Sequence, residues 1–252
     1  MDLTELSQRR AQMGRSIQPW IAANGPRAVG EVSSGYWLVL TGSPGADGNM
    51  ALVHDGDTST LKTVRDLVEA RGYPTLLMLA GHPRQRSIGP NWVFQGQLPF
   101  MSLELASASL RPDGRVRRAQ ADDFDTVVDL VTEANPFGPE VAEVGVAILR
   151  ERVDTPAIWL LSENDVPVST VSSAVVDDAV CIWSMATPSR YGRRGYGRAI
   201  LSHALHDAYS RSEAVIGLLT ASPAGRSLYE AVGWSVVEEW EMFISPGRTE
   251  SR

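Results

Sequence analysis

The segment Arg193-Arg194-Gly195-Tyr196-Gly197-Arg198 combines two closely spaced glycines with three arginines. It follows an apolar run, Ala179 to Met185, and opens an amphipathic segment that continues to Arg211, so the pattern predicts a strand, a turn and a helix. Glycines let backbone N–H groups converge where a Cβ would intrude, and the start of a helix adds unpaired N–H groups and a positive dipole end. This arrangement favours the binding of a phosphate or pyrophosphate.

A second group of residues follows the next apolar run, Ala214 to Ala221. Ser222-Pro223 is typical of a helix start, with Ser222 as the N-cap and Pro223 as the first helical residue. On that helix Tyr229 has Gly225 and Gly233 one turn away on either side, which predicts room for a ligand beside its ring. Tyr229 is the best single catalytic candidate, and packing of its ring on helix neighbours is the alternative.

Together these two motifs resemble the GNAT N-acetyltransferases. In that family the cofactor turn has the form Arg/Gln-x-x-Gly-x-Gly/Ala, and the next helix carries a Leu-Tyr pair, here Leu228-Tyr229, before Gly and an aromatic, here Gly233-Trp234. The resemblance spans roughly residues 115 to 246. One departure is Gly192, which stands where the family prefers Arg or Gln. The resemblance implies an α+β fold, a mixed sheet flanked by helices, with acetyl-CoA as co-substrate and an amine as acceptor, either a small molecule or a peptide.

The resemblance also implies a role for each site residue. The turn would hold the CoA pyrophosphate, and Tyr229 would donate to the departing sulfur. The pantetheine arm would lie along the strand end, as an added strand does; these residues are Ser184, Met185, Ala186 and Thr187. Ser222 and Arg226 would lie near the cofactor, although Ser222 caps a helix without one, Arg226 also suits solvent, and the strand end also suits a plain central strand. No carboxylate has a motif that identifies it as the general base.

The composition restricts the partners. A net charge of −7 over 252 residues argues against a general nucleic-acid binder and mildly favours cationic partners such as amines. The single cysteine, Cys181, lies in an apolar run, which predicts a reduced, buried thiol. His203 and His206 fall opposite the apolar helix face, where we expect them to be solvated, so no metal site is predicted. The first residues lack a leader pattern and no apolar segment reaches about 18 residues, so we expect no membrane association and a cytoplasmic location.

The N-terminal half repeats the order of elements found in the C-terminal half. Helix 58–71, strand 75–80 and Asn91-Trp92 mirror helix 198–211, strand 215–221 and Gly233-Trp234. We therefore predict two tandem copies, residues 1–108 and 109–252, packed as an internal pseudo-dimer; we expect a monomer and leave a homodimer open. Residues 2 to 24 look helical up to the stop at Gly25-Pro26.

The first copy lacks the binding chemistry of the second. The segment His54-Asp55-Gly56-Asp57-Thr58 places two carboxylates where the second copy has arginines, and these would cap a helix but repel a pyrophosphate. We expect a degenerate lobe that is structural or shapes the substrate site. Two other functions stay open: a CoA-binding regulatory or assembly module without turnover, and a nucleotide-binding protein.

Overall fold

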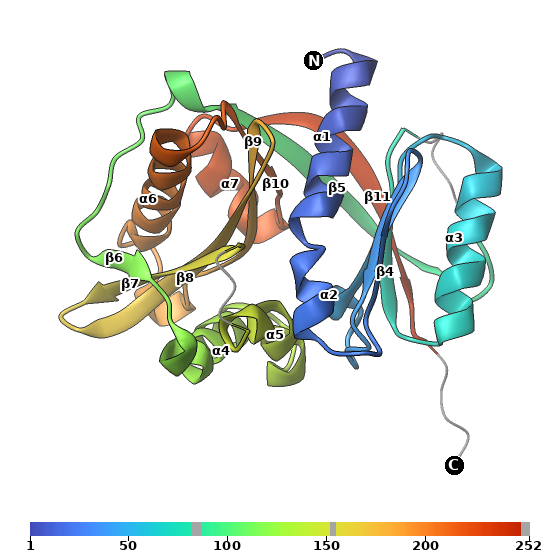
Figure 1. Ribbon diagram of the computed structural model, residues 1–252, viewed down its shortest axis with the longest axis horizontal. Coiled ribbons are helices and arrows are strands. Elements are labelled where there is room, and N and C mark those ends of the chain that lie inside the picture. The colour runs from blue at the N-terminus through green and yellow to red at the C-terminus, as the bar shows by residue number, and fades with distance from the viewer. Residues whose placement is uncertain (82–86, 152–154, 248–252) are drawn as a thin grey trace.

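A computed structural model describes residues 1–81, 87–151 and 155–247 (Figure 1). In these residues the strands form one mixed sheet in the order β1-β2-β3-β4-β11-β5-β10-β9-β8-β7-β6. The strands are β1 Val29–Val32, β2 Tyr36–Leu40, β3 Asn49–Val53, β4 Thr75–Leu79, β5 Val93–Glu104, β6 Val116–Arg118, β7 Ala157–Glu163, β8 Val166–Val176, β9 Ala179–Ala186, β10 Ile216–Thr220 and β11 Ser235–Ser245. The helices are α1 Leu3–Ser16, α2 Pro19–Ala23, α3 Thr58–Arg71, α4 Phe124–Ala134, α5 Pro139–Val146, α6 Tyr196–Arg211 and α7 Pro223–Ala231. The mixed sheet with flanking helices confirms the predicted α+β class.

The sheet exchanges one strand between its two halves. β5, from the N-terminal half, lies between β10 and β11, and β11, the last strand, lies between β4 and β5. From this central pair outward, β4-β3-β2-β1 on one side has the same order as β10-β9-β8-β7 on the other. In both halves the parallel pair, β3 with β4 and β9 with β10, is connected through a helix, α3 or α6. This is the order that two tandem copies would have, and the duplication and its boundary at residue 108 stay predictions.

Helices cover both faces of the strongly bent sheet. In Figure 1, α1, α2, α4 and α5 lie on the inner side of the bend, α3 covers the outer side of the N-terminal half, and α6 and α7 cover the outer side of the C-terminal half. The inner core includes the central rings of Phe100 and Trp240, which stack with centroids 4.7 Å apart and are fully buried. The two exchanged strands therefore meet inside the core.

Helix α1 ties the two halves together. Arg9 pairs with Asp178 in the β8–β9 turn at 2.6 Å, and Arg10 pairs with Glu238 on β11 at 2.5 Å. Both arginine side chains are largely buried. Arg9 also pairs with Glu5 at 3.4 Å, whereas losing Glu238 would leave the buried charge of Arg10 unpaired. The helix predicted over residues 2 to 24 is divided at Ile17-Gln18, because Pro19 starts the new helix α2 at its first position.

Candidate active site

The site begins where two parallel strands separate. β9 and β10 pair only at Ala179–Ile216, Val180–Gly217 and Cys181–Leu218, so the end of β9 has no β10 residue beside it. A β-bulge changes the direction of this strand end. The register of β9 with β8 shifts between Trp183 and Ala186, and Ser184 has a φ of 47°. Backbone groups around Ser184 and Met185 therefore lie beside an opening in the sheet rather than opposite a neighbouring strand.

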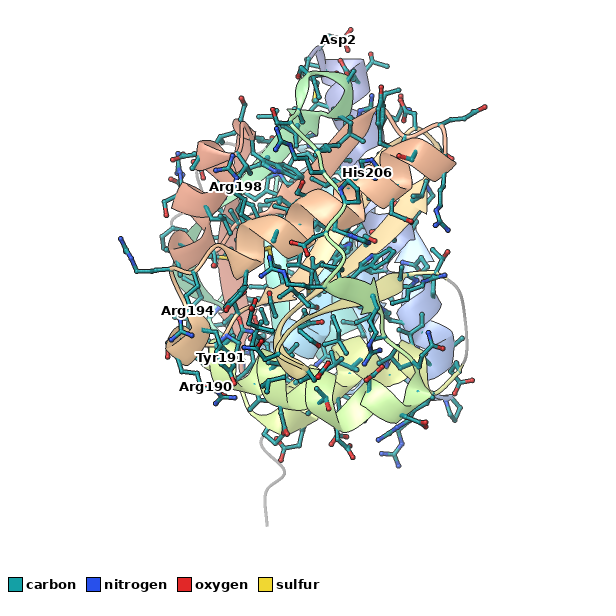
Figure 2. All side chains as sticks on the ribbon, turned by 90° about the vertical axis from the view of Figure 1, so that its left-hand side faces the viewer. Asp2, Arg190, Tyr191, Arg194, Arg198 and His206 are labelled. Carbon is teal, nitrogen blue, oxygen red and sulfur yellow. The ribbon has the colours of Figure 1, made fainter. Side chains whose placement is uncertain are left out.

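The glycine and arginine turn adjoins this opening. Gly195 caps α6 with a φ of 83°, a conformation that favours glycine, and the first helical bond runs from Ala199 N–H to the Gly195 carbonyl. The N–H groups of the first turn therefore have no acceptor within the helix. Arg193, Arg194 and Arg198 are exposed, and in the described part of the chain no ion pair occupies them. Figure 2 shows Arg190, Arg194 and Arg198 along the same side of the molecule.

Packing fixes the start of α6 against the end of β9. A Cβ on Gly197 would lie 2.9 Å from the Met185 Cε and 3.4 Å from the Thr187 Oγ1, so glycine allows the helix to approach the strand. The Tyr196 side chain is buried in the core beneath Arg115, and only its backbone can face a ligand at the turn. The hydroxyl of Thr187 shares a 2.7 Å hydrogen bond with Ser169, whose Oγ lies 3.0 Å from the carbonyl of the buried Ala186.

Tyr229 lies next to the bulge. Its hydroxyl donates to the Met185 Sδ at 3.6 Å, and its ring meets Trp234 edge-on at 6.0 Å. Burial raises the pKa of Tyr229 to about 12. A Cβ on Gly225 would lie 3.0 Å from the ring, so the room expected there for a ligand is filled by the tyrosine itself. The phenol is thus a neutral hydrogen-bond donor beside Met185.

The other two predicted residues on α7 have partners within the protein. Ser222 is the N-cap, as predicted, and its side chain accepts from the Gly225 N–H at 3.2 Å. Arg226 pairs with Glu230 at 2.8 Å and with Glu239 at 3.3 Å. Of the two, only Ser222 lines the cavity beside Tyr229.

A cavity of about 370 Å³ extends from the bulge into the N-terminal half. Ser184, Met185 and Tyr229 contribute to one wall. The opposite wall has residues from elements that carry no motif, including Trp20, Asp47, Met50, Leu76 and Met78. No sequence motif marks this wall, and its only sequence signal is the acidic residue within the turn-rich segment 42–48.

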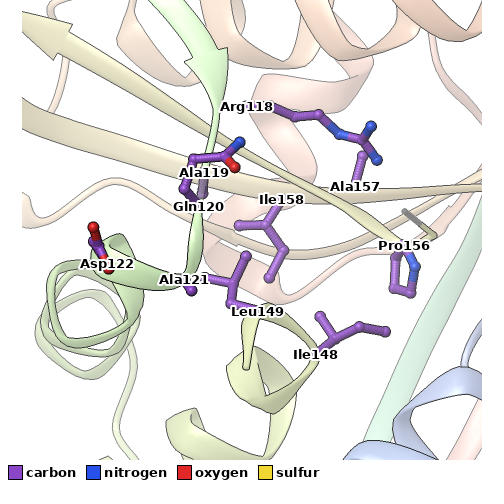
Figure 3. A pocket seen from close by; sticks show the side chains of 10 residues that line it. All are labelled: Arg118, Ala119, Gln120, Ala121, Asp122, Ile148, Leu149, Pro156, Ala157 and Ile158. Atoms are coloured by element: carbon purple, nitrogen blue, oxygen red, sulfur yellow. The ribbon is translucent and has the colours of Figure 1, made fainter. Parts of the chain in front are cut away.

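A larger pocket of about 510 Å³ lies elsewhere (Figure 3). Its lining includes Arg118, Gln120, Asp122, Leu149 and Pro156, at the β6–β7 edge of the sheet. None of the predicted site residues lines it. Its size therefore does not make it the candidate site.

Other reactive groups are held in structural roles. Cys181 is fully buried, and burial raises its pKa to about 12, which does not suit a nucleophile. His203 accepts from the Asp113 N–H at 3.0 Å and contacts the Trp159 ring, so the expectation that it is solvated was wrong. The described residues contain no cluster of three or more metal-ligating side chains. Among their helices, none has the length and hydropathy needed to span a bilayer.

One family model matches part of this chain. Residues 124–234 match the model of the acetyltransferase (GNAT) family, a segment that includes β9, the turn, α6 and Tyr229. This segment is therefore similar to the GNAT family, as the resemblance predicted. A search of curated proteins finds no match to the chain.

Solved structures share the fold across nearly the whole chain. A GCN5-related N-acetyltransferase from Kribbella flavida is 16% identical, with a TM-score of 0.65, covering 95% of this chain and 96% of its own. A putative GNAT-family acetyltransferase from Novosphingobium aromaticivorans DSM 12444 is 12% identical, with a TM-score of 0.65, covering 97% of this chain and 99% of its own. A functionally unknown protein from Staphylococcus epidermidis ATCC 12228 is 12% identical, with a TM-score of 0.61, covering 86% and 93%. At these identities the likeness shows the fold, and it includes the N-terminal half.

Proposed function

We propose that the protein is an acetyl-CoA-dependent N-acetyltransferase that transfers the acetyl group to a primary amine by direct attack. The observation that carries this proposal is the separation of β9 from β10 beside the unpaired N–H groups of α6. The turn residues suit a pyrophosphate, because segment 187–198 contains four arginines and no carboxylate. A Cβ on Gly197 would meet the terminal methyl of Met185, so glycine favours this close approach of helix and strand.

Each part of the site has a distinct task. Arg193, Arg194 and the first N–H groups of α6 bind the CoA phosphates, and the edge of β9 at Ser184 to Thr187 binds the pantetheine amides. Acetyl-CoA supplies an activated thioester. A backbone N–H near Met185 polarises the thioester carbonyl, and the Tyr229 hydroxyl donates to the sulfur that leaves.

The transfer needs no covalent enzyme intermediate. The neutral amine nitrogen forms a bond to the carbonyl carbon, the carbon–sulfur bond breaks, and the proton that the nitrogen then loses reaches the sulfur through water, so CoA leaves as the thiol. The acceptor arrives as an ammonium group, which must lose a proton to water before its nitrogen can attack. Cys181 lies within the paired part of β9 and is fully buried, so it does not act as an acyl carrier.

The experiment that tests this function measures free thiol released from acetyl-CoA over a panel of amines, together with thermal shifts caused by CoA and by ATP. We expect amine-dependent thiol release and stabilisation by CoA. Stabilisation by ATP but not by CoA would overturn the assignment.

A CoA-binding module without turnover is the second candidate, because Gly192 occupies the position where the family prefers Arg or Gln. Firm binding of CoA with no thiol release on any amine would favour it over the enzyme.

A further inference from the structure

The cavity beside Tyr229 continues beyond the residues that would bind acetyl-CoA. Its far side is built by strands of the N-terminal half and by the exchanged strand β11, through Met50, Leu76, Met78 and Met242. α2 and α5 close it further through Trp20 and the helix face around Val141. A donor site alone would not need this wall, so the space is available to an acceptor.

The wall is strongly apolar. The rings of Trp20 and Trp183 meet edge-on at 5.8 Å, and Phe137 and Trp240 also line the space. The N–H of Trp183 is already bonded to the Ser16 Oγ at 2.8 Å, so this indole has no free donor. Such a surface binds hydrocarbon or aromatic groups and penalises a hydroxyl that loses its water.

One charge faces this apolar space. Among the described residues that line the cavity, Asp47 is the only one that is charged at neutral pH. Asp47 is exposed to solvent at the rim of this space, and desolvation by the neighbouring atoms raises the pKa of its carboxyl above the ordinary value. No arginine, lysine or histidine of the described chain forms a salt bridge with it. A carboxylate in this setting is complementary to an ammonium group.

Helix α5 sets the spacing between this carboxylate and the transfer site. A Cβ on Gly45, two residues before Asp47, would abut Val141, and a Cβ on Gly145 would lie 3.5 Å from the Ser184 Oγ. Val141 and Gly145 lie about one helical turn apart, or about 6 Å along the axis. The loop of Asp47 and the bulge of β9 are therefore close neighbours across the cavity.

We propose, on the basis of the acetyltransferase function above, that the acceptor is a small amine with an aromatic or branched aliphatic body, recognised by Asp47 through its ammonium group. The apolar body occupies the space between the two halves, and the carboxylate selects the cation. The cavity volume of about 370 Å³ suits a small molecule. A polyhydroxylated aminoglycoside would lose hydration on this wall, and the same apolar lining offers few polar partners for a peptide backbone.

The first test replaces the carboxylate. Acetyl transfer to phenethylamine and isoamylamine is measured for the wild type, Asp47→Asn, Asp47→Glu and the control Asp129→Asn, which removes an exposed carboxylate of α4 outside the cavity. We expect Asp47→Asn to raise KM for both amines about tenfold, the effect of losing one charge-assisted hydrogen bond, without changing KM for acetyl-CoA. Asp47→Glu should recover part of the loss, and Asp129→Asn should behave as the wild type.

The second test reduces the space. Met50→Trp should lower kcat/KM for phenethylamine while sparing methylamine, and the melting temperature shows whether the variant is folded. If Asp47→Asn leaves KM for amines unchanged while the wild type is active, the recognition role is wrong and the transferase function stands. Preference of the wild type for an aminoglycoside or a peptide would overturn the substrate class. If Met50→Trp alters only the choice among longer acyl-CoA donors, the space is an acyl pocket. Absence of transfer to every amine would instead remove the proposed function.

Discussion

At the scale of single residues, the pKa of Tyr229 determines what its hydroxyl can do. A pKa of about 12 lies roughly 3.5 units above that of a thiol near 8.5, so complete proton transfer to the leaving sulfur would cost about 5 kcal/mol. A hydrogen bond to the developing thiolate does not require this transfer. Tyr229 therefore stays neutral across the neutral pH range, and in the proposed reaction it serves as a hydrogen-bond donor.

We expect Tyr229→Phe to lower kcat about 10- to 100-fold, because a hydrogen bond to a charged group is worth about 1.5–3 kcal/mol. KM for acetyl-CoA should change little, and the shape of the kcat profile between pH 6 and 9 should stay the same, since Tyr229 does not titrate there. Steady-state kinetics check this, with Tyr209→Phe as the control on an exposed part of α6. An unchanged kcat would contradict the role.

His54 gives a second prediction, for stability rather than catalysis. Burial, with Arg10 nearby, lowers the pKa of His54 to about 4, and its ring nitrogens have no hydrogen-bond partner among the described residues. A lowered folded-state pKa means that the unfolded chain binds the proton first. Stability is therefore intact above pH 6.5 and is lost as the pH falls toward 4.

Between pH 7 and pH 4 the free energy of unfolding should fall by about 3 kcal/mol because of His54. The reason is that each unit by which its pKa is lowered corresponds to about 1.36 kcal/mol. Denaturant unfolding of the wild type and of His54→Leu between pH 7 and pH 4 measures it. The variant should lose less stability over that range. Parallel curves for the two proteins would show that His54 does not titrate as described.

At the scale of elements, the start of α6 joins two independent sources of positive potential. One is the set of unpaired N–H groups, which persists whatever the side chains are, and the other is the exposed arginines. Their contributions respond differently to salt, because exposed charges are screened within about 10 Å at 0.1 M. The affinity for CoA should therefore weaken, but not vanish, when the arginines are removed.

The double variant Arg193→Ala with Arg194→Ala should weaken CoA binding about tenfold at low ionic strength, since each exposed charge contributes up to about 1 kcal/mol. The difference from the wild type should shrink in high salt. Calorimetric titration at two salt concentrations measures both effects. Arg211→Ala, at the other end of the same helix, is the matched control, and an equal loss in that variant would point to net charge rather than to the turn.

Elements whose cause is local could be predicted from the sequence. The Ser222 cap, the α6 helix after Gly195 and the burial of Cys181 each follow from a few neighbouring residues, and the structure confirms them. The cavity wall could not be predicted, because Asp47 and Ser184 come to line one cavity through the tertiary fold and not through a motif. β1, which pairs with β2, was also missed, since its segment Val29–Val32 has little apolar periodicity.

At the scale of the whole molecule, the exchanged strands make each half depend on the other. β5 pairs along β10 from Glu104 to Phe100, and β11 pairs along β4 from Thr75 to Leu79. A cut at residue 108 would remove β5 from the sheet that carries the glycine and arginine turn. The two predicted copies are thus continuous in sequence but not in the sheet.

Residues 109–252 expressed alone should therefore fail to form a stable, CoA-binding protein. Co-expression with residues 1–108 should restore binding, and co-expression with residues 1–92, which lack β5, should not. Amide NMR spectra and thermal shift with CoA measure the outcome. A folded fragment 109–252 that binds CoA alone would show that β5 is dispensable for the site.

The place of β11 also determines when this protein can fold in the cell. Its neighbours β4 and β5 have both left the ribosome long before Ser235–Ser245 is made, so the gap between them stays open during most of synthesis. Until that gap closes, two strand edges are exposed to other chains, which is the state in which aggregation begins. We therefore expect the nascent chain to depend on chaperones and to complete its sheet only after translation reaches the last strand.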